Sequence, residues 1–266
     1  MYILDKIVAH KKKELAEQKK KVSLNMMAKS AEDYLLSVNR KIISMRDCLR
    51  ESKSGIISEF KRRSPSKGWI REDGKADEIP LSYSENGASA ISILTDKEYF
   101  GGSTDYLMVA RSIINHTPLL RKEFIIDEYQ VFESLLIGAD AILLIASDLS
   151  LSECRHLSAL AKDLGLEVLL EIHDEKELDY VGDNIDMVGV NNRHLGTFHT
   201  DVMNSMRIAP LLPSDYVLVS ESGISSATTV KELRSVGFRG FLIGETFMRS
   251  ADPGKSLRKF IQEIEN

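Results

Sequence analysis

Lysine and carboxylate side chains end several of the short apolar segments in this 266-residue sequence. Glu59 and Lys61 close the first such segment, and Lys122 lies within a later one. The other polar residues at segment ends are Arg121 and Glu123, Glu171 and His173, Asn191, Asn192 and Arg193, and Glu221 and Ser222. Lysine and carboxylate groups that share a site can donate and accept protons at a bound molecule. These polar residues occur at too many segment ends to reflect chance exposure.

Glu59 and Lys61 are two residues apart, so both side chains project to the same side if their segment is a strand. The apolar side chains that alternate with them would face covering helices. The side chains of Glu59 and Lys61 would then point to the opposite side of the strand, which is the interior of the fold. A buried charge without a partner costs several kcal/mol. Such charges therefore either pair among themselves, as a capping ion-pair layer, or meet a ligand. Arg121, Glu123 and His173, taken singly, are equally compatible with packing against helices.

Two later segments indicate anion binding. The stretch SESGI at 220–224 follows one apolar run and opens a helix, and IGETF at 243–247 follows the next run. Small residues there expose backbone N–H groups beside helix N-termini, which predicts a phosphate site. The alternative is that each glycine only turns the chain. The basic loop KRRSPSKGWI at 61–70 is expected to be a mobile lid over an anionic substrate, or else a solvated surface loop.

Eight short runs rich in Ile, Val and Leu must position these residues. Most are continuously apolar, which is typical of strands covered on both faces in an all-parallel sheet. The segments between them are predicted to be helices, because Ser or Asp lies near the start of each and Gly often lies near the end. The predicted strands lie in 55–61, 89–96, 118–126, 141–147, 167–173, 187–192, 216–222 and 240–244, and examples of predicted helices are 103–114, 127–139, 150–165 and 225–237.

Eight strands alternating with helices predict an α/β fold, a closed (β/α)8 TIM barrel rather than an open doubly wound sheet. This barrel carries its reactive groups at the carboxyl ends of the strands, where the charged residues lie. Residues 1–50 precede the first strand and are expected to add N-terminal helices over the bottom or rim. We therefore expect one barrel domain over 1–266, with 1–50 as its helical extension.

Composition excludes several other classes of protein. The hydrophobic fraction is 43%, the charged fraction 28% and the net charge -5, which argues against a membrane span and against nucleic acid as a partner. Cys48 and Cys154 have no partner pattern for a disulfide framework or zinc site, so we expect neither metal nor cofactor. No secretory signal is recognisable, so we expect a cytoplasmic location. The lysines at 11–13 and 19–21 are expected to form a solvated helix face.

Six motifs together resemble the indole-3-glycerol phosphate synthase family. They are EFKRRSPSKG (59–68), LLRKEFI (119–125), LLEIH (169–173), GVNNR (189–193), SESGI (220–224) and IGETFM (243–248). They occur in the family's order, one per expected strand, and the resemblance covers nearly the whole chain. It implies ring closure of 1-(2-carboxyphenylamino)-1-deoxyribulose 5-phosphate, with loss of carbon dioxide and water, in tryptophan biosynthesis.

The resemblance also implies roles for individual residues. Lys122 matches the general acid of ring closure, Glu171 and Glu59 match catalytic carboxylates, and Lys61 matches a lysine that meets the substrate and aids proton transfer. The remaining implied site residues are the polar Asn191, Glu221 and Ser222, and the substrate- or phosphate-binding Ser64, Arg193, Gly223, Gly244 and Glu245. His194 departs from the family pattern, where an acidic or amide residue is usual.

The chemistry of this reaction agrees with those residue types. The sugar ketone must be protonated as the aromatic carbon attacks it, which suits a cationic acid such as Lys122. Expelling the hydroxyl needs a further acid, and restoring aromaticity needs a base, for which Lys61, Glu59 and Glu171 are candidates. Which lysine donates at which step stays open at the level of sequence.

Three alternatives are open. Another phosphosugar barrel, such as phosphoribosylanthranilate isomerase, shares the phosphate loops but does not require a lysine at position 122. A Schiff-base aldolase would use Lys122 as a nucleophile. A non-catalytic binding module would not need Glu59, Lys61 and Glu171. For partners we expect a small phosphorylated substrate, no nucleic acid and no membrane, with the chain acting as a monomer or weak homo-oligomer.

Overall fold

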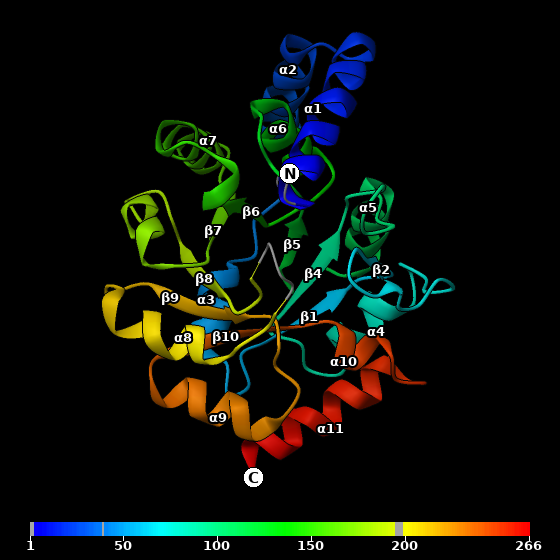
Figure 1. Ribbon diagram of the computed structural model, residues 1–266. Helices are drawn as coiled ribbons and strands as arrows, with labels where there is room; N and C mark the ends of the chain where they lie inside the picture. The colour runs from blue at the N-terminus through cyan, green and yellow to red at the C-terminus, as the bar shows by residue number, and fades with distance from the viewer. Residues whose placement is uncertain (1–2, 39, 195–198) are drawn as a thin grey trace.

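In the computed structural model, which describes residues 3–38, 40–194 and 199–266, eight parallel strands close into a barrel. This arrangement confirms the predicted (β/α)8 fold (Figure 1). The strands are β1 (Ile56–Phe60), β4 (Ala90–Leu94), β5 (Leu119–Lys122), β6 (Ala141–Ile145), β7 (Glu167–Ile172), β8 (Met187–Asn191), β9 (Val217–Glu221) and β10 (Phe238–Ile243). Each strand pairs with its neighbours in sequence, and β1 pairs with β10 to close the barrel. Every strand falls within or overlaps a predicted run.

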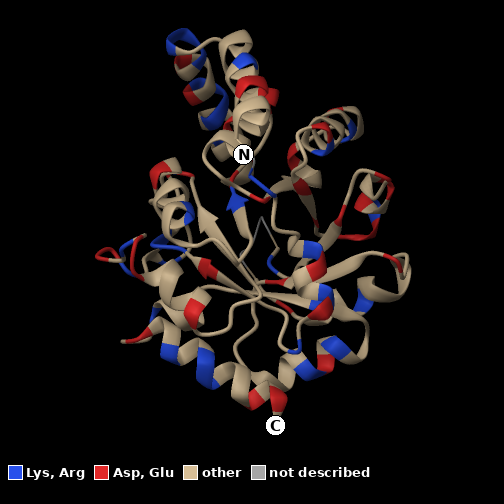
Figure 2. Ribbon diagram, turned by 180° about the vertical axis from the view of Figure 1, so that it is seen from behind, with Lys and Arg blue, Asp and Glu red and all other residues tan. Residues whose placement is uncertain are grey.

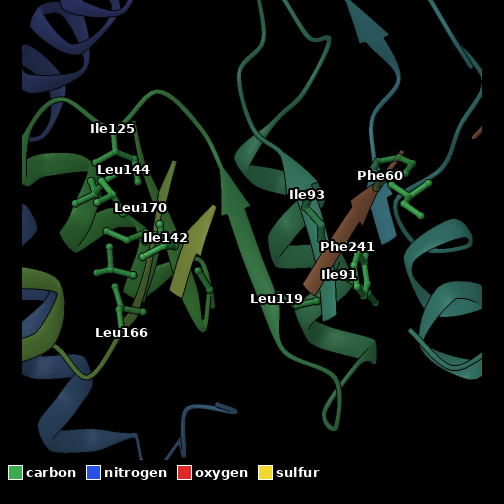
Figure 3. Packing of buried hydrophobic residues seen from close by; sticks show 14 of the residues in the cluster. Phe60, Ile91, Ile93, Leu119, Ile125, Ile142, Leu144, Leu166, Leu170 and Phe241 are labelled. Carbon is green, nitrogen blue, oxygen red and sulfur yellow. The ribbon is translucent and has the colours of Figure 1, made fainter. Parts of the chain in front are cut away.

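Strand residues alternate between two apolar layers. Leu120 and Leu169 belong to the cluster inside the barrel, whereas their neighbours Leu119 and Leu170 belong to the larger cluster between strands and helices. Figure 3 shows part of this outer layer, with Leu119, Leu144 and Leu170 among its members. Burial on both faces explains the continuously apolar runs, because neither side of a strand meets water.

Helices cover the outside of the barrel and begin at side-chain caps. Ser103, Asp127, Ser150 and Ser226 each accept a backbone N–H in the first turn of the helix that follows. The covering helices are α4 (Ile79–Glu85), α5 (Thr104–Ile113), α6 (Glu128–Leu136), α7 (Leu151–Asp163), α8 (Met203–Ile208), α9 (Ala227–Ser235) and α11 (Pro253–Glu265), with α10 (Glu245–Met248) as a short turn after β10. Acidic and basic residues are interspersed on these helices in the reverse view (Figure 2).

The segment before β1 contributes helices at both ends of the barrel. Helix α3 (Met45–Glu51) closes the bottom, since Met45 and Leu49 join the inner apolar cluster. Helices α1 (Ile3–Lys21) and α2 (Leu24–Ser37) lie beside α6 at the rim (Figure 1), and α2 packs against α6. Over the described ranges, none of the helices combines the length and apolar character that a membrane crossing requires.

One expectation for the N-terminal helix is wrong. Lys11 is only 4% exposed, whereas the sequence analysis placed it on a solvated face. The buried side chains of α1 are Ile7, Lys11 and Leu15. They recur every four residues and therefore share one face of the helix. Lys12 and Lys13 are exposed, as expected.

Candidate active site

A cavity of about 540 Å³ opens at the carboxyl ends of the barrel strands. The parallel register places these ends at one rim, with Asn191 opposite Glu221 and Lys122 opposite Leu94. The cavity brings together all of the residues that the sequence analysis assigned to the site: Glu59, Lys61, Ser64, Lys122, Glu171, Asn191, Arg193, Glu221, Ser222, Gly223, Gly244 and Glu245. Charged groups that are far apart in the sequence thus share one enclosed space.

Lys122 lies between two carboxylates at the centre of this rim. Its Nζ atom is 2.7 Å from Oε2 of Glu171 and 2.8 Å from Oε2 of Glu221. Burial alone would lower the pKa of Lys122, but Glu171 and Glu221, with a contribution from Glu59, outweigh burial and raise it. The lysine is therefore an ammonium ion, held in place by two nearly inaccessible carboxylates from β7 and β9.

The two carboxylates around Lys122 have different surroundings. Glu171 also accepts a hydrogen bond from Nδ2 of Asn191 at 2.9 Å. Burial would raise the pKa of Glu171, but Lys122 and His173 hold it well below its usual range. Burial raises the pKa of Glu221 to about 7; Lys122 opposes this shift and Glu171 adds to it. Glu171 is thus an anion, while Glu221 can change protonation near neutral pH.

Glu59 and Lys61 form a second, separate pair. Lys61 makes an ion pair with Oε1 of Glu59, which is buried at the end of β1. The side chain of Lys61 is 21% exposed and faces the cavity opening more than that of Lys122 does, at 14%. Each lysine therefore has its own ion-pair partners, and Glu59 in addition acts at longer range on the pKa of Lys122.

Two glycines make room for these carboxylates. A side chain at Gly189 would meet Oε1 of Glu221 at 2.2 Å, and one at Gly244 would meet Oε1 of Glu59 at 2.5 Å. Both distances are far below van der Waals contact. Gly244 was predicted only as a phosphate-loop residue, so its position against Glu59 is an additional structural role.

The loops after β9 and β10 have the expected backbone features. Ser222 and Gly223 are consecutive residues with left-handed backbone, at φ 69° and 78°. This conformation is costly for serine and is often found at functional sites. Asn192 supports the turn, because its Nδ2 donates to the carbonyl oxygen of Ser222 at 3.1 Å. Gly244 caps α10, and Ser64 and Arg193 line the same cavity.

The loop at 61–70 is folded as a small hairpin, β2 (Arg63–Ser64) paired with β3 (Gly68–Trp69). The guanidinium of Arg62 lies 5.4 Å from the ring centroid of Trp69 and 5.5 Å from that of Tyr106 in α5. These cation–π contacts tie the hairpin to the barrel wall. Pro65 at its tip lines the cavity. Closure of this loop over a substrate stays a prediction.

Several strand-end residues do not line the cavity. Arg121 points outward to α6, where its Nη2 atom is 2.5 Å from Oε2 of Glu133 and Nη1 donates to the carbonyl of Gln130. His173 is also absent from the cavity wall, although it contacts Glu171. His194 is exposed and its backbone N–H donates to the carbonyl of His199. Outward packing was one of the two alternatives left open for Arg121 and His173.

Sequence reasoning missed the apolar part of the wall. Ile3, Leu4 and Ile7 of α1 line the cavity together with Phe100 and Phe124 from the loops after β4 and β5. The two rings are 5.9 Å apart between centroids. The helical spacing of the apolar residues of α1 was visible in the sequence, but it does not show which surface the face covers. Across the part of the chain described here, there is no cluster of His, Cys, Asp and Glu suited to a metal ion.

Comparisons with known proteins agree with this geometry. The family model described as indole-3-glycerol phosphate synthase matches residues 4–260. A protein of that name from Bacteroides thetaiotaomicron is 51% identical over 263 residues, covering 99% of each chain. One from Aliarcobacter butzleri is 43% identical, covering 97% of this chain and 98% of its own.

Among solved structures, similarity at low identity supports the fold alone. The 3-hexulose-6-phosphate synthase from Salmonella typhimurium superposes with a TM-score of 0.62 at 15% identity, covering 79% of this chain and 98% of its own. Tryptophan synthase subunit alpha from Legionella pneumophila superposes with a TM-score of 0.61 at 14% identity, covering 84% of this chain and 99% of its own.

Proposed function

The chain belongs to the indole-3-glycerol phosphate synthase family, and we propose that the cavity around Lys122 is where it carries out that family's reaction. The protein is a carbon–carbon lyase of tryptophan biosynthesis that forms indole-3-glycerol phosphate. The observation that carries the assignment of the site is the buried ammonium of Lys122 between Glu171 and Glu221.

We propose that the substrate spans the cavity from a polar end to an apolar end. Its phosphate group would lie against the turn at Ser222 and Gly223 and against the start of α10, where Gly244 leaves the backbone accessible. Its aromatic ring would pack against Phe100 and Phe124 under α1. This orientation sets the sugar ketone between the two ends, near Lys122.

Ring closure would use Lys122 as the general acid. The ring carbon that bears the carboxylate attacks the ketone carbon, and Lys122 donates a proton to the developing alkoxide. Glu171 and Glu221 orient the ammonium before the proton is transferred. Departure of carbon dioxide from the attacked ring carbon then restores the benzenoid ring without a protein base.

Dehydration would use the second pair. The new hydroxyl leaves as water once Lys61 protonates it, and the ring nitrogen supplies the electron pair that assists its departure. A carboxylate then removes a proton from the carbon next to nitrogen, which completes the indole; Glu59 and Glu171 are the candidates. Two protons enter and one leaves, which balances the loss of carbon dioxide from a substrate carboxylate.

A Schiff-base aldolase is disfavoured by the electrostatics of the site. A nucleophilic lysine must be neutral, and enzymes achieve this by lowering its pKa. The neighbouring Glu171 and Glu221 instead raise the pKa of Lys122, despite burial. Trapping with borohydride and a keto-sugar phosphate should therefore yield no covalent adduct at Lys122.

The test is to mix purified protein with 1-(2-carboxyphenylamino)-1-deoxyribulose 5-phosphate and follow indole fluorescence, with Lys122→Met in parallel. We expect fluorescence from the wild type and a loss of at least about 10²-fold in kcat for the variant. Wild-type turnover retained by Lys122→Met would reject Lys122 as the acid. No product from either protein would reject the proposed function.

We also infer that the protein acts as one domain, as a monomer or weak homo-oligomer, in the cytoplasm. Support comes from the cavity wall, which one chain supplies from its first helix to the loop after its last strand. Light scattering over a range of protein concentrations tests the oligomeric state. A stable large assembly at every concentration would contradict this inference.

A further inference from the structure

The ammonium group of Lys11 is buried in the middle of the apolar face of α1. Its Nζ atom lies 2.6 Å from Oε2 of Glu14, 3.1 Å from Oδ1 of Asp96 and 3.2 Å from Oε1 of Glu123. Asp96 and Glu123 are themselves almost inaccessible, at 0% and 4% exposure. Both follow barrel strands, β4 and β5, so this one side chain ties the N-terminal helix to two adjacent strand ends.

The partners of Lys11 also order the loops that carry the cavity's two phenylalanines. Oδ2 of Asp96 accepts the backbone N–H groups of Tyr99 at 2.8 Å and Phe100 at 3.2 Å. Oε1 of Glu123 accepts the backbone N–H of Phe124 at 3.0 Å. Each carboxylate therefore joins Lys11 to the backbone of an aromatic residue in the cavity wall.

The same helix carries apolar residues into the cavity one to two turns before Lys11. Ile7 precedes it by four residues and Leu4 by seven, so both share its face of the helix. A second ion pair, between Lys19 and Asp127 at 2.7 Å, lies two turns further from the cavity. Loss of the Lys11 contacts would therefore leave the far end of α1 attached and release the end that covers the site.

We propose that Lys11 is a positioning residue: its ion pairs with Asp96 and Glu123 hold α1, Phe100 and Phe124 together as an apolar roof over the aromatic end of the substrate. Lys11 does not itself line the cavity, so it acts through these residues. The proposal rests on the proposed function, which supplies the aromatic substrate.

The chemistry of the partners makes Lys11 hard to replace. Without it, Asp96 would lose the cation that faces it and Glu123 would keep only Arg121, whose Nη2 atom is 3.9 Å from its Oε2; burying carboxylates with so little compensation is strongly unfavourable. The ends of β4 and β5 would then move apart or admit water. The roof would pack against the aromatic ring through apolar contacts and would supply no proton-transfer group to the reacting carbon, so its loss removes binding that ground state and transition state share. Such a loss raises KM more than it lowers kcat.

The experiment compares Lys11→Met with Lys13→Met, which changes an exposed lysine of the same helix. We expect Lys11→Met to raise KM by about 10-fold or more with kcat within about 3-fold of wild type, and Lys13→Met to match wild type. Hydrogen exchange should show faster exchange over residues 3–10 in Lys11→Met only. Lys11→Arg, which keeps the charge, should recover part of the loss in KM.

Asp96→Asn provides a second variant in case Lys11→Met does not fold. It keeps an oxygen for the N–H groups of Tyr99 and Phe100 but removes the charge that faces Lys11. We expect Asp96→Asn to raise KM and to speed hydrogen exchange over residues 3–10, both less than Lys11→Met does. Equal KM and equal exchange in Asp96→Asn, Lys11→Met and wild type would overturn the proposal, as would a loss of kcat with KM and exchange unchanged. Absence of product from wild type would instead reject the proposed function, while hydrogen exchange would still test the anchoring.

Discussion

The Nε2 atom of His173 lies 3.3 Å from Oε1 of Glu171, so each oxygen of this carboxylate has its own cationic neighbour, His173 on one and Lys122 on the other. The Nδ1 atom of His173 lies 3.5 Å from Oε2 of Glu177. Burial would lower the pKa of His173, but Glu171 and Glu177 outweigh it and raise the pKa to about 10. His173 is therefore an imidazolium that supports the ionised state of Glu171 from behind the cavity wall.

This arrangement predicts how His173 contributes to stability as pH changes. Its folded pKa, about 10, lies above the unfolded value of 6.5, so the contribution is complete below pH 6.5 and is lost as pH rises toward 10. The difference in unfolding free energy between wild type and His173→Gln should shrink over that interval in urea titrations. A difference that grows with pH would contradict this assignment. Glu171, Glu177 and Asp148 are the charged groups that face the ring.

Asp148 also lowers stability as pH rises, but through a penalty that grows instead of a stabilisation that fades. It follows β6 in a short 3-10 turn, η1 (Ala146–Asp148), and neither of its carboxylate oxygens has a hydrogen-bond partner among the described residues. Burial raises its pKa to about 8, and Glu171 adds to the shift while His173 opposes it. An acid with a raised folded pKa loses stability as pH rises from its unfolded value, 3.8, to its folded value.

Asp148→Asn should therefore stabilise the protein by an amount that increases between pH 4 and pH 8 and is constant above about pH 8. Thermal unfolding of wild type and variant across this interval measures the effect. Asp183→Asn, a change of an exposed aspartate before β8, serves as the control and should leave the stability close to that of wild type. A variant less stable than wild type at pH 8 would contradict the prediction that the buried carboxyl of Asp148 costs stability.

Replacing Glu171 by Gln should lower kcat by about 10²-fold or more, because Lys122 loses one of its two orienting anions and the site loses a candidate base. KM should change less, since the phosphate and aromatic contacts remain. The surface variant Glu232→Gln, on the exposed side of α9, should match wild type. A variant of Glu171 with full turnover would remove this residue from the mechanism.

The sequence was sufficient for the barrel and for most of the polar wall. Strands buried on both faces leave long apolar runs, and parallel strands bring their carboxyl ends to one rim, so residues at the ends of separate runs must meet. The inward direction of Lys122 was also open to prediction. Leu120 lies inside the barrel, and a residue two positions later on the same strand faces the same way. The same alternation sends Arg121 outward to α6.

The roof could not be predicted, for a physical reason. A lysine next to Lys12 and Lys13 has the sequence environment of a solvated helix face. Lys11 is buried because it pairs with Asp96 and Glu123, which lie at the ends of two strands far from α1 in the sequence. Docking of one element on another depends on such long-range pairings, and hydrophobic periodicity within α1 shows only that some surface is covered.

Gly189 leaves room for the carboxylate of Glu221. It faces Oε1 of Glu221 across neighbouring strands, at a distance of only 2.2 Å from where a Cβ atom would stand. Gly189→Ala must therefore displace the carboxylate that orients Lys122, and displacement by about 1 Å can cost about 10²-fold in rate. We expect kcat to fall by that order while the phosphate contacts preserve binding. Gly182→Ala is the matched control, because no atom lies within 4 Å of its Cβ position. If both alanine variants turn over like wild type, Glu221 tolerates displacement and the rate does not depend on its contact with Lys122.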